Sequence, residues 1–125
     1  MKAHTDLEQS KKLAEILPIE SADMCWTKYV DTGDITSLHV TVNYGIVPIE
    51  YPCWSLAALL EQLHYEVCDD DGYSTYLQIN KDDDMYQLEY IDPSEIFESI
   101  ETDRYEHFVD ACVAMIEKLH KLNLL

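Results

Sequence analysis

One stretch near the middle of the chain, Pro52–Leu63, constrains the fold more than any other part of the sequence. Ser55 is a favourable N-cap, because its hydroxyl can accept a hydrogen bond from a free amide in the first helical turn. The spacing after the cap places four leucines on one helix face: Leu56, Leu59, Leu60 and Leu63. The stretch therefore predicts an amphipathic helix that frays near Val67 and leads into a loop at Cys68–Gly72.

A helical pattern also begins near the amino-terminal end of the sequence. Thr5 and Glu8 have the spacing of a capping box, in which Thr5 caps the helix and Glu8 bonds back to the cap amide. We expect this helix to run from about Asp6 to Leu17, because Pro18 cannot continue it.

The last helix is predicted by a second capping-box pattern, Asp103 to Glu106, followed by a long apolar stripe. The stripe consists of Tyr105, Phe108, Cys112, Met115, Leu119 and Leu122, flanked by Ala111 and Ile116. Cations near its end suit the negative end of the helix dipole, and these are Lys118, His120 and Lys121. Asn123 can close the helix.

Two hairpins are predicted between the helices, and the first joins Met24–Val30 to Ser37–Tyr44. The intervening Asp31–Asp34 has the composition of a turn. The second of these strands alternates apolar and polar residues. The facing of the first strand stays open, because Trp26 and Tyr29 fall on opposite sides of it.

The second hairpin has a more specific pattern. Tyr73–Asn80 and Met85–Ile91 flank a four-residue loop, Lys81–Asp84. Pairing Asn80 with Met85 places six residues on one side of the sheet: Ile79, Tyr86, Leu77, Leu88, Thr75 and Tyr90. The other side then carries the alternate residues Tyr76, Gln78, Gln87 and Glu89.

The predicted elements follow the order α-β-β-α-β-β-α. This order favours an α+β domain, in which an antiparallel sheet of two hairpins carries the helices mainly on one face. Helices on both faces, or a sheet split into two separate hairpins, are the alternatives. A length of 125 residues fits a single small domain, 1–125.

The net charge of −17 is the strongest feature of the composition. Between Tyr29 and Asp103 there are 17 acidic residues and one basic residue, Lys81, so this part carries −16. Nucleic acids and anionic membranes are poor partners for such a surface, because both bind through Lys and Arg. A basic protein surface is a suitable partner, although high charge also serves solubility alone.

The candidate interaction surface combines the acids of two loops with residues of the second hairpin. Its members are Asp69, Asp70, Asp71, Tyr76, Asp82, Asp83, Asp84 and Glu89. Tyrosine buries a large area at low entropic cost in protein interfaces, and strands also favour it for packing alone.

We expect no metal site and no cofactor. Asp69–Asp71 and Asp82–Asp84 offer the oxygen ligands that calcium prefers, but they lack the spacing of an EF-hand loop. His64 and Cys68 are four residues apart and can share a helix face, but two ligands do not make a zinc site. No glycine-rich nucleotide motif or hydrolase motif is present, so no catalytic residue is assigned.

The four cysteines fit the reduced, structural residues of a cytosolic protein: Cys25, Cys53, Cys68 and Cys112. The sequence starts without an apolar signal segment and has no run of about 18 apolar residues, the length of a membrane span. We therefore expect a cytoplasmic location.

Three segments resemble a known group of proteins, in the same order along most of the chain. They are Leu7–Trp26 (LEQSKKLAEILPIESADMCW), Ile49–Leu63 (IEYPCWSLAALLEQL) and Phe108–Leu122 (FVDACVAMIEKLHKL). They are similar to a family of small uncharacterised proteins of phages, prophages and mobile elements of gut Bacteroidetes, with P-x-W-S-L-x-x-L-L as the most distinctive part. The resemblance implies a bacterial or phage cytosolic origin and assigns no activity and no site residue.

The acidic hairpins favour a non-enzymatic protein-interaction module, such as an inhibitor or DNA mimic that docks on a basic protein surface. A small metal- or cysteine-dependent enzyme is the alternative. The arrangement of the acids separates the two hypotheses, because an enzyme needs acids, His or Cys gathered in one concave pocket. Charge spread over an exposed surface favours the interaction module.

Overall fold

The computed structural model describes residues 2–27, 39–42, 51–68, 71–94 and 98–125. Its elements are α1 (Leu7–Ala14), a 3₁₀ turn (Ile19–Ser21), β1 (Met24–Thr27), β2 (His39–Val42), β3 (Tyr51–Cys53), α2 (Leu56–Gln62), β4 (Glu66–Cys68), β5 (Ser74–Asp82), β6 (Met85–Ile91), β7 (Ile100–Glu101) and α3 (Phe108–Lys121). The α+β class and the order of helices and hairpins are confirmed. No helix within the described ranges is long and apolar enough to cross a membrane.

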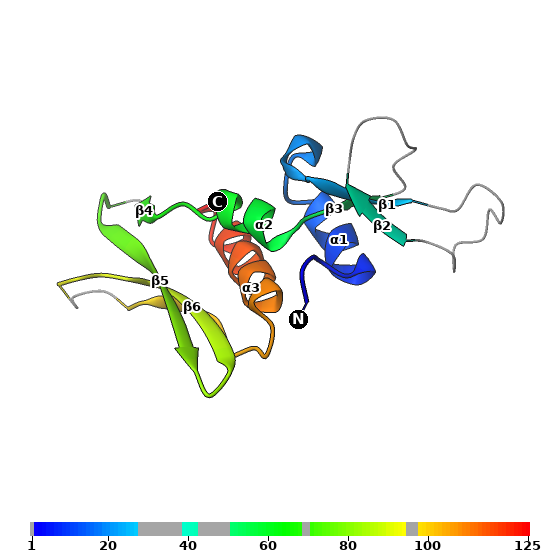
Figure 1. Ribbon diagram of the computed structural model, residues 1–125. Helices are drawn as coiled ribbons and strands as arrows, with labels where there is room; N and C mark the ends of the chain where they lie inside the picture. Colours follow the sequence, from blue (N-terminus) through cyan, green and yellow to red (C-terminus); the bar gives the residue numbers. More distant parts are fainter. Residues whose placement is uncertain (1, 28–38, 43–50, 69–70, 95–97) are drawn as a thin grey trace.

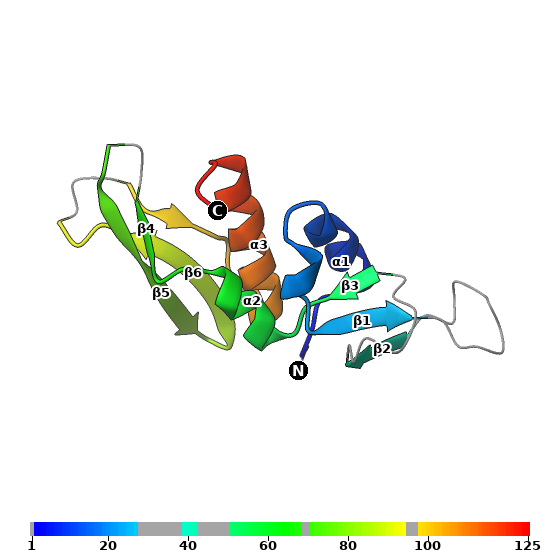
Figure 2. The ribbon, with the colours of Figure 1, turned by 90° about the horizontal axis from the view of Figure 1, so that it is seen from above.

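The strands form two separate antiparallel sheets, which is one of the arrangements that the sequence left open. The first has the order β2-β1-β3 and the second the order β4-β5-β6-β7. Figures 1 and 2 show two lobes along the molecule: α1 with the three-stranded sheet, and α2 and α3 with the four-stranded sheet. We call these the amino-terminal lobe and the carboxy-terminal lobe.

The predicted first hairpin is confirmed in its pairing, whereas the turn at Asp31–Asp34 lies outside the described residues. Trp26 pairs with Val40 and Tyr51, and its indole Nε1 donates to Ser10 Oγ on α1 over 3.0 Å. This settles the facing of β1, because the Trp26 side of the strand meets α1. Strand β3 was not predicted, and its proline is tolerated because an edge strand has only one ladder to complete.

Helix α1 begins one residue later than the capping box predicted. Asp6 is the N-cap, and it exchanges hydrogen bonds with Gln9. Thr5 is instead fully buried. Its hydroxyl lies 2.8 Å from Ser10 Oγ and accepts from the amide of Trp54 over 3.2 Å. The prediction of a Thr5–Glu8 box was therefore wrong, because the Thr5 hydroxyl binds the amide of Trp54, which is distant in sequence, and does not cap the helix.

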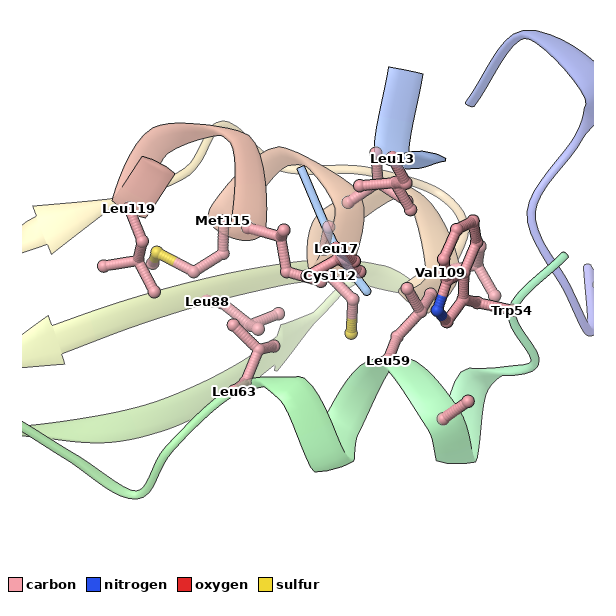
Figure 3. Packing of buried hydrophobic residues seen from close by; sticks show 14 of the residues in the cluster. Leu13, Leu17, Trp54, Leu59, Leu63, Leu88, Val109, Cys112, Met115 and Leu119 are labelled. Carbon is pink, nitrogen blue, oxygen red and sulfur yellow. The ribbon is translucent and has the colours of Figure 1, made fainter. Parts of the chain in front are cut away.

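The central helix, α2, begins where the sequence predicts. Ser55 Oγ accepts from the amide of Ala58 over 3.2 Å, and the carboxylate of Asp23 accepts from the amide of Ser55 over 2.9 Å. Trp54 and Leu59 are fully buried, and Figure 3 shows both in the core beside side chains of α3. The helix ends at Gln62 and does not fray towards Val67, which belongs to β4.

The last helix, α3, begins at Phe108 and not at Asp103 as the second capping box predicted. Tyr105 is unavailable for the helix because it exchanges backbone hydrogen bonds with Tyr86 over 2.6 and 2.8 Å. The predicted stripe is otherwise confirmed as core, although Leu122 at its end is 49% exposed. Asn123 closes the helix with a φ of 56°, as expected.

The second hairpin is confirmed, but its register differs by two residues from the prediction. Asp82 pairs with Met85, so that Ile79 faces Leu88 and the loop shrinks to two residues. A shift of two residues leaves every side chain on its predicted face, because the side-chain period of a strand is two. The hairpin is flanked by two short strands that were not predicted, β4 and β7.

Candidate interaction surface

The four-stranded sheet has one buried face and one open face. The buried face carries Val67, Leu88 and Tyr90, which lie in the core with α2 and α3. The open face, called the outer face below, carries the alternate residues Glu66, Cys68, Ser74, Tyr76, Gln78, Asn80, Asp82, Met85, Gln87, Glu89, Ile91 and Glu101. All twelve are half-buried or exposed, and Figures 1 and 2 show the helices on the other side of this sheet.

The outer face is strongly acidic. It holds four carboxylates and no lysine or arginine. Glu89 and Glu101 lie directly opposite one another on β6 and β7. Like charges in this position repel each other and destabilise a sheet. Among the described residues, no cation lies within 4 Å of either carboxylate.

One arginine reaches the edge of this face. Arg104 lies 3.3 Å from a carboxylate oxygen of Asp82, with both side chains more than 60% exposed. Exposed ion pairs contribute about 0–1 kcal/mol, so this contact neutralises little of the surface. The described lysines have other partners or places: Lys2, Lys11 and Lys12 belong to the amino-terminal lobe, and Lys2 binds Asp6 and also Asp110 of α3. Lys118 of α3 reaches β7, where its ammonium donates to the backbone carbonyl of Glu101 and not to a carboxylate.

Hydrogen bonds hold two of the acids in place on the outer face. The carboxylate of Glu66 accepts from Ser74 Oγ over 2.5 Å. The carboxylate of Glu89 accepts from the amide of Asn80 over 2.9 Å, and Asn80 in turn accepts from Gln78. These acids are thus positioned by neighbouring strands rather than free to sample many orientations.

The residues predicted for the interaction surface are spread along β5. Tyr76 and Glu89 share the outer face, as the alternation predicted, and Asp82, predicted in the loop, joins them because β5 extends to it. Asp83 and Asp84 form the turn at one end of β5, and Asp71 precedes the strand at the other end. The strand between them, Ser74–Asp82, is roughly 26 Å long at about 3.3 Å per residue. Asp69 and Asp70 lie outside the described residues. The prediction thus describes a surface and not a pocket.

An open groove on this face was missed by the sequence reasoning. Tyr65 and Tyr76 lie with ring centroids 5.5 Å apart, and Ile91 and Pro93 line the same groove of about 450 Å³. Tyr65 was missed because the central helix was expected to continue through it. The strand that follows it, Glu66–Cys68, has only three residues, so the sequence offers no periodic signal for it.

Among the described residues, no three His, Cys, Asp or Glu side chains are grouped closely enough to hold a metal ion. His64 and Cys68 do not share a helix face, because the helix ends before both.

Three of the four cysteines are buried. Burial raises the pKa values of Cys25, Cys53 and Cys112, in the last case to about 12. Since the thiolate is the reactive form, these thiols are poor nucleophiles.

Comparisons with known proteins add no functional residue to this surface. No protein-family model, curated protein or solved structure matches the chain.

Proposed function

We propose that the chain is a non-enzymatic protein-interaction module whose outer face docks on a basic surface of another protein. The observation that carries the proposal is the Glu89–Glu101 pair on an open sheet face. Within the described part of the chain neither carboxylate has an ion-pair partner, so the two repel each other across the strands. A cationic partner placed over them would convert this repulsion into attraction. The surrounding acids of the outer face extend the same charge to either side.

The sharpest form of this proposal is an inhibitor that occupies the nucleic-acid site of a basic protein, as a DNA mimic. A nucleic-acid site is built of Lys and Arg that bind phosphates, so an ordered acidic sheet face is chemically complementary to it. An inhibitor of a basic toxin uses the same complementarity. The resemblance to mobile-element proteins of Bacteroidetes supports a bacterial cytoplasm as the place of action.

Two triple variants test the proposal at equal net charge. The outer-face variant carries Glu66→Gln, Glu89→Gln and Glu101→Gln. The control carries Glu8→Gln, Glu15→Gln and Glu20→Gln, which are exposed acids of the amino-terminal lobe. Each immobilised protein is exposed to a Bacteroidetes lysate, retained proteins are identified by mass spectrometry, and the affinity of each purified partner is measured by calorimetry.

We expect a basic partner that binds the unchanged chain and the control variant with similar affinity. The outer-face variant should bind it about tenfold more weakly, which corresponds to about 0.5 kcal/mol for each exposed charge pair. A DNA mimic should also displace a DNA duplex from that partner. Equal binding of the two variants would contradict the proposal, because the location of the charge would then be irrelevant.

A further inference from the structure

The groove between Tyr65 and Tyr76 differs in chemistry from the rest of the outer face. Tyr65 lies in the bend before β4 and is 71% exposed, so its ring is open to solvent. Its neighbour Tyr76 is half-buried and pairs with Ile91 across the hairpin. With Leu77 and Pro93, these side chains give a mainly apolar, aromatic lining, to which Gln78 adds one polar group, on a face that is otherwise mostly polar.

Carboxylates flank this groove. Glu66 lies directly opposite Tyr76 on β4, on the same side of the sheet. Glu89 pairs with Gln78, so that it lies diagonal to Tyr76 on β6. Diagonal neighbours on a sheet are about 7–8 Å apart, which is within reach of a long side chain. The aromatic rings are therefore flanked by an acid on each neighbouring strand.

We infer that this groove receives an arginine side chain of the basic partner, an inference that rests on the proposed docking of the outer face. A guanidinium group is planar, stacks on aromatic rings and binds carboxylates through paired N–H donors. Its three-carbon stem can lie along apolar groups such as Ile91 and Pro93. A lysine ammonium is strongly hydrated and lacks the planar geometry, so it matches this combination of rings and acids less well.

Two peptides of equal charge separate the inference from the proposed function. Hexa-arginine and hexa-lysine are titrated into the ¹⁵N-labelled chain, and both affinities are followed by chemical-shift changes. Charge complementarity alone predicts equal, salt-dependent binding of both peptides. The groove predicts about two- to fivefold tighter binding of hexa-arginine, the fold-change that corresponds to an exposed cation–π contact. The largest extra shifts should occur at Tyr65, Tyr76 and Ile91.

Variants of the rings assign the preference to the groove. Tyr76→Leu and Tyr65→Leu should each reduce the affinity for hexa-arginine to that for hexa-lysine, whereas Tyr76→Phe keeps a ring and should retain the preference. Tyr73→Leu is the control, because Tyr73 is a half-exposed tyrosine that does not line the groove. Since Tyr65 is largely exposed, Tyr65→Leu tests the groove even if Tyr76→Leu disturbs the sheet.

Each outcome decides one of the two statements. The inference is supported if the unchanged chain prefers arginine, if both Tyr65→Leu and Tyr76→Leu abolish this preference, and if Tyr73→Leu leaves it intact. Equal binding of the two peptides overturns the inference and leaves the docking proposal standing. The docking proposal itself is contradicted if neither peptide binds the unchanged chain. It is also contradicted if the triple outer-face variant binds both peptides as tightly as the unchanged chain does.

Discussion

Asp83 and Asp84 hold the left-handed backbone conformation that the tight turn between β5 and β6 requires. Their φ angles are 48° and 63°, and a two-residue turn with both values positive matches type I′. Asn-Gly is the preferred sequence for this turn, because an L-residue with a Cβ atom is strained there. Aspartate tolerates the conformation better than most residues. The turn therefore retains strain that glycine would relieve.

Two substitutions at Asp84 that remove the same charge should change stability in opposite directions. Asp84→Gly should raise the free energy of unfolding by up to about 1 kcal/mol, because glycine adopts positive φ without strain. Asp84→Ala should lower it by about 1 kcal/mol, because alanine has neither glycine's freedom nor the local hydrogen bonding of aspartate. Urea unfolding of both variants measures the difference. Equal effects would show that the charge, and not the backbone, decides stability here.

Tyr90 links the buried face of the sheet to the segment after α2. Its hydroxyl donates to the carbonyl oxygen of His64 over 2.6 Å, and burial raises the pKa of Tyr90 to about 12. An unfolded tyrosine releases its proton near pH 10, whereas the folded one holds it up to about pH 12. Stability from this group is therefore complete below pH 10 and is lost as the pH rises towards 12.

Tyr90→Phe should accordingly have opposite consequences at neutral and alkaline pH. At pH 7 the variant loses one hydrogen bond, and its free energy of unfolding should fall by about 1 kcal/mol. As the pH rises from about 10 to 12, its stability should decline less steeply than that of the unchanged chain, because it has no phenol to ionise. Urea unfolding at a series of pH values measures both slopes. Parallel curves would show that Tyr90 does not contribute to alkaline unfolding.

At the level of elements, the pairing of β6 with β7 combines a strong contact with an unfavourable one. Thr102, just after β7, exchanges hydrogen bonds with the backbone of Leu88: its hydroxyl accepts over 3.1 Å and its amide donates over 2.9 Å. The adjacent Glu89–Glu101 pair opposes the same association by charge repulsion. The two-residue strand is therefore held by Thr102 and by Lys118 of α3, whose ammonium donates to the carbonyl oxygen of Glu101.

Glu101→Lys should make the isolated chain more stable and its proposed docking weaker. The substitution converts a facing like-charge pair into an opposite-charge pair, which contributes about 0.2–1 kcal/mol on a sheet. Thermal unfolding measures the gain in stability, and calorimetry with the basic partner measures the loss in affinity. Glu61→Lys, on an exposed site of α2, is the matched control for charge. A variant that gains stability and keeps its affinity would argue against docking at this pair.

Sequence patterns predicted the elements better than their ends. Ser55 was predicted correctly because its cap depends on residues only three positions away. Thr5 was not, since Trp54 and Ser10 compete for its hydroxyl. Likewise Tyr105 pairs with Tyr86 and delays the start of α3. Helix boundaries here depend on tertiary contacts that a local pattern does not contain.

The candidate surface was predicted in part for a similar reason. Alternation placed Tyr76 and Glu89 on one face correctly even though the register was wrong, because a two-residue shift conserves faces. The partners of those residues, Tyr65 and Glu101, were missed. Glu101 belongs to a strand of two residues, and Tyr65 comes directly before a strand of three residues. Such short strands show no periodic pattern.

At the scale of the whole molecule, the net charge of −17 makes self-repulsion a general property of the folded chain. Raising the salt concentration from about 0.01 to 1 M shortens the Debye length from about 30 to 3 Å and screens that repulsion. We therefore expect the melting temperature at pH 7.5 to rise by a few degrees. A falling melting temperature would mean that ion pairs such as Lys2–Asp110 outweigh the repulsion.

Carboxylates with hydrogen-bond or ion-pair partners stabilise the folded chain, in contrast to those that repel each other, and acid pH should remove this stabilisation. Burial opposes ionisation of Asp6, but the amide of Gln9 and the Lys2 ammonium outweigh it and lower the pKa of Asp6. The stability from this group is present above its unfolded pKa and is lost as the pH falls through the lower folded pKa. Asp6→Ala, which also removes the α1 cap, should therefore destabilise the chain at pH 7 and have a smaller effect at pH 2.5. Thermal melts at the two pH values compare the variant with the unchanged chain, and an equal effect at both would contradict this.

Helix α3 comes last in the chain, yet it packs against α1, α2 and β6 (Figure 3). On a ribosome, the apolar faces of those elements would therefore emerge before the helix that covers them. At about 5–20 residues per second, the segment from Leu63 to Phe108 takes roughly 2–9 s to make. During that interval the half-made core is open to chaperones and to other nascent chains. Folding of this core is thus completed only after α3 has been made.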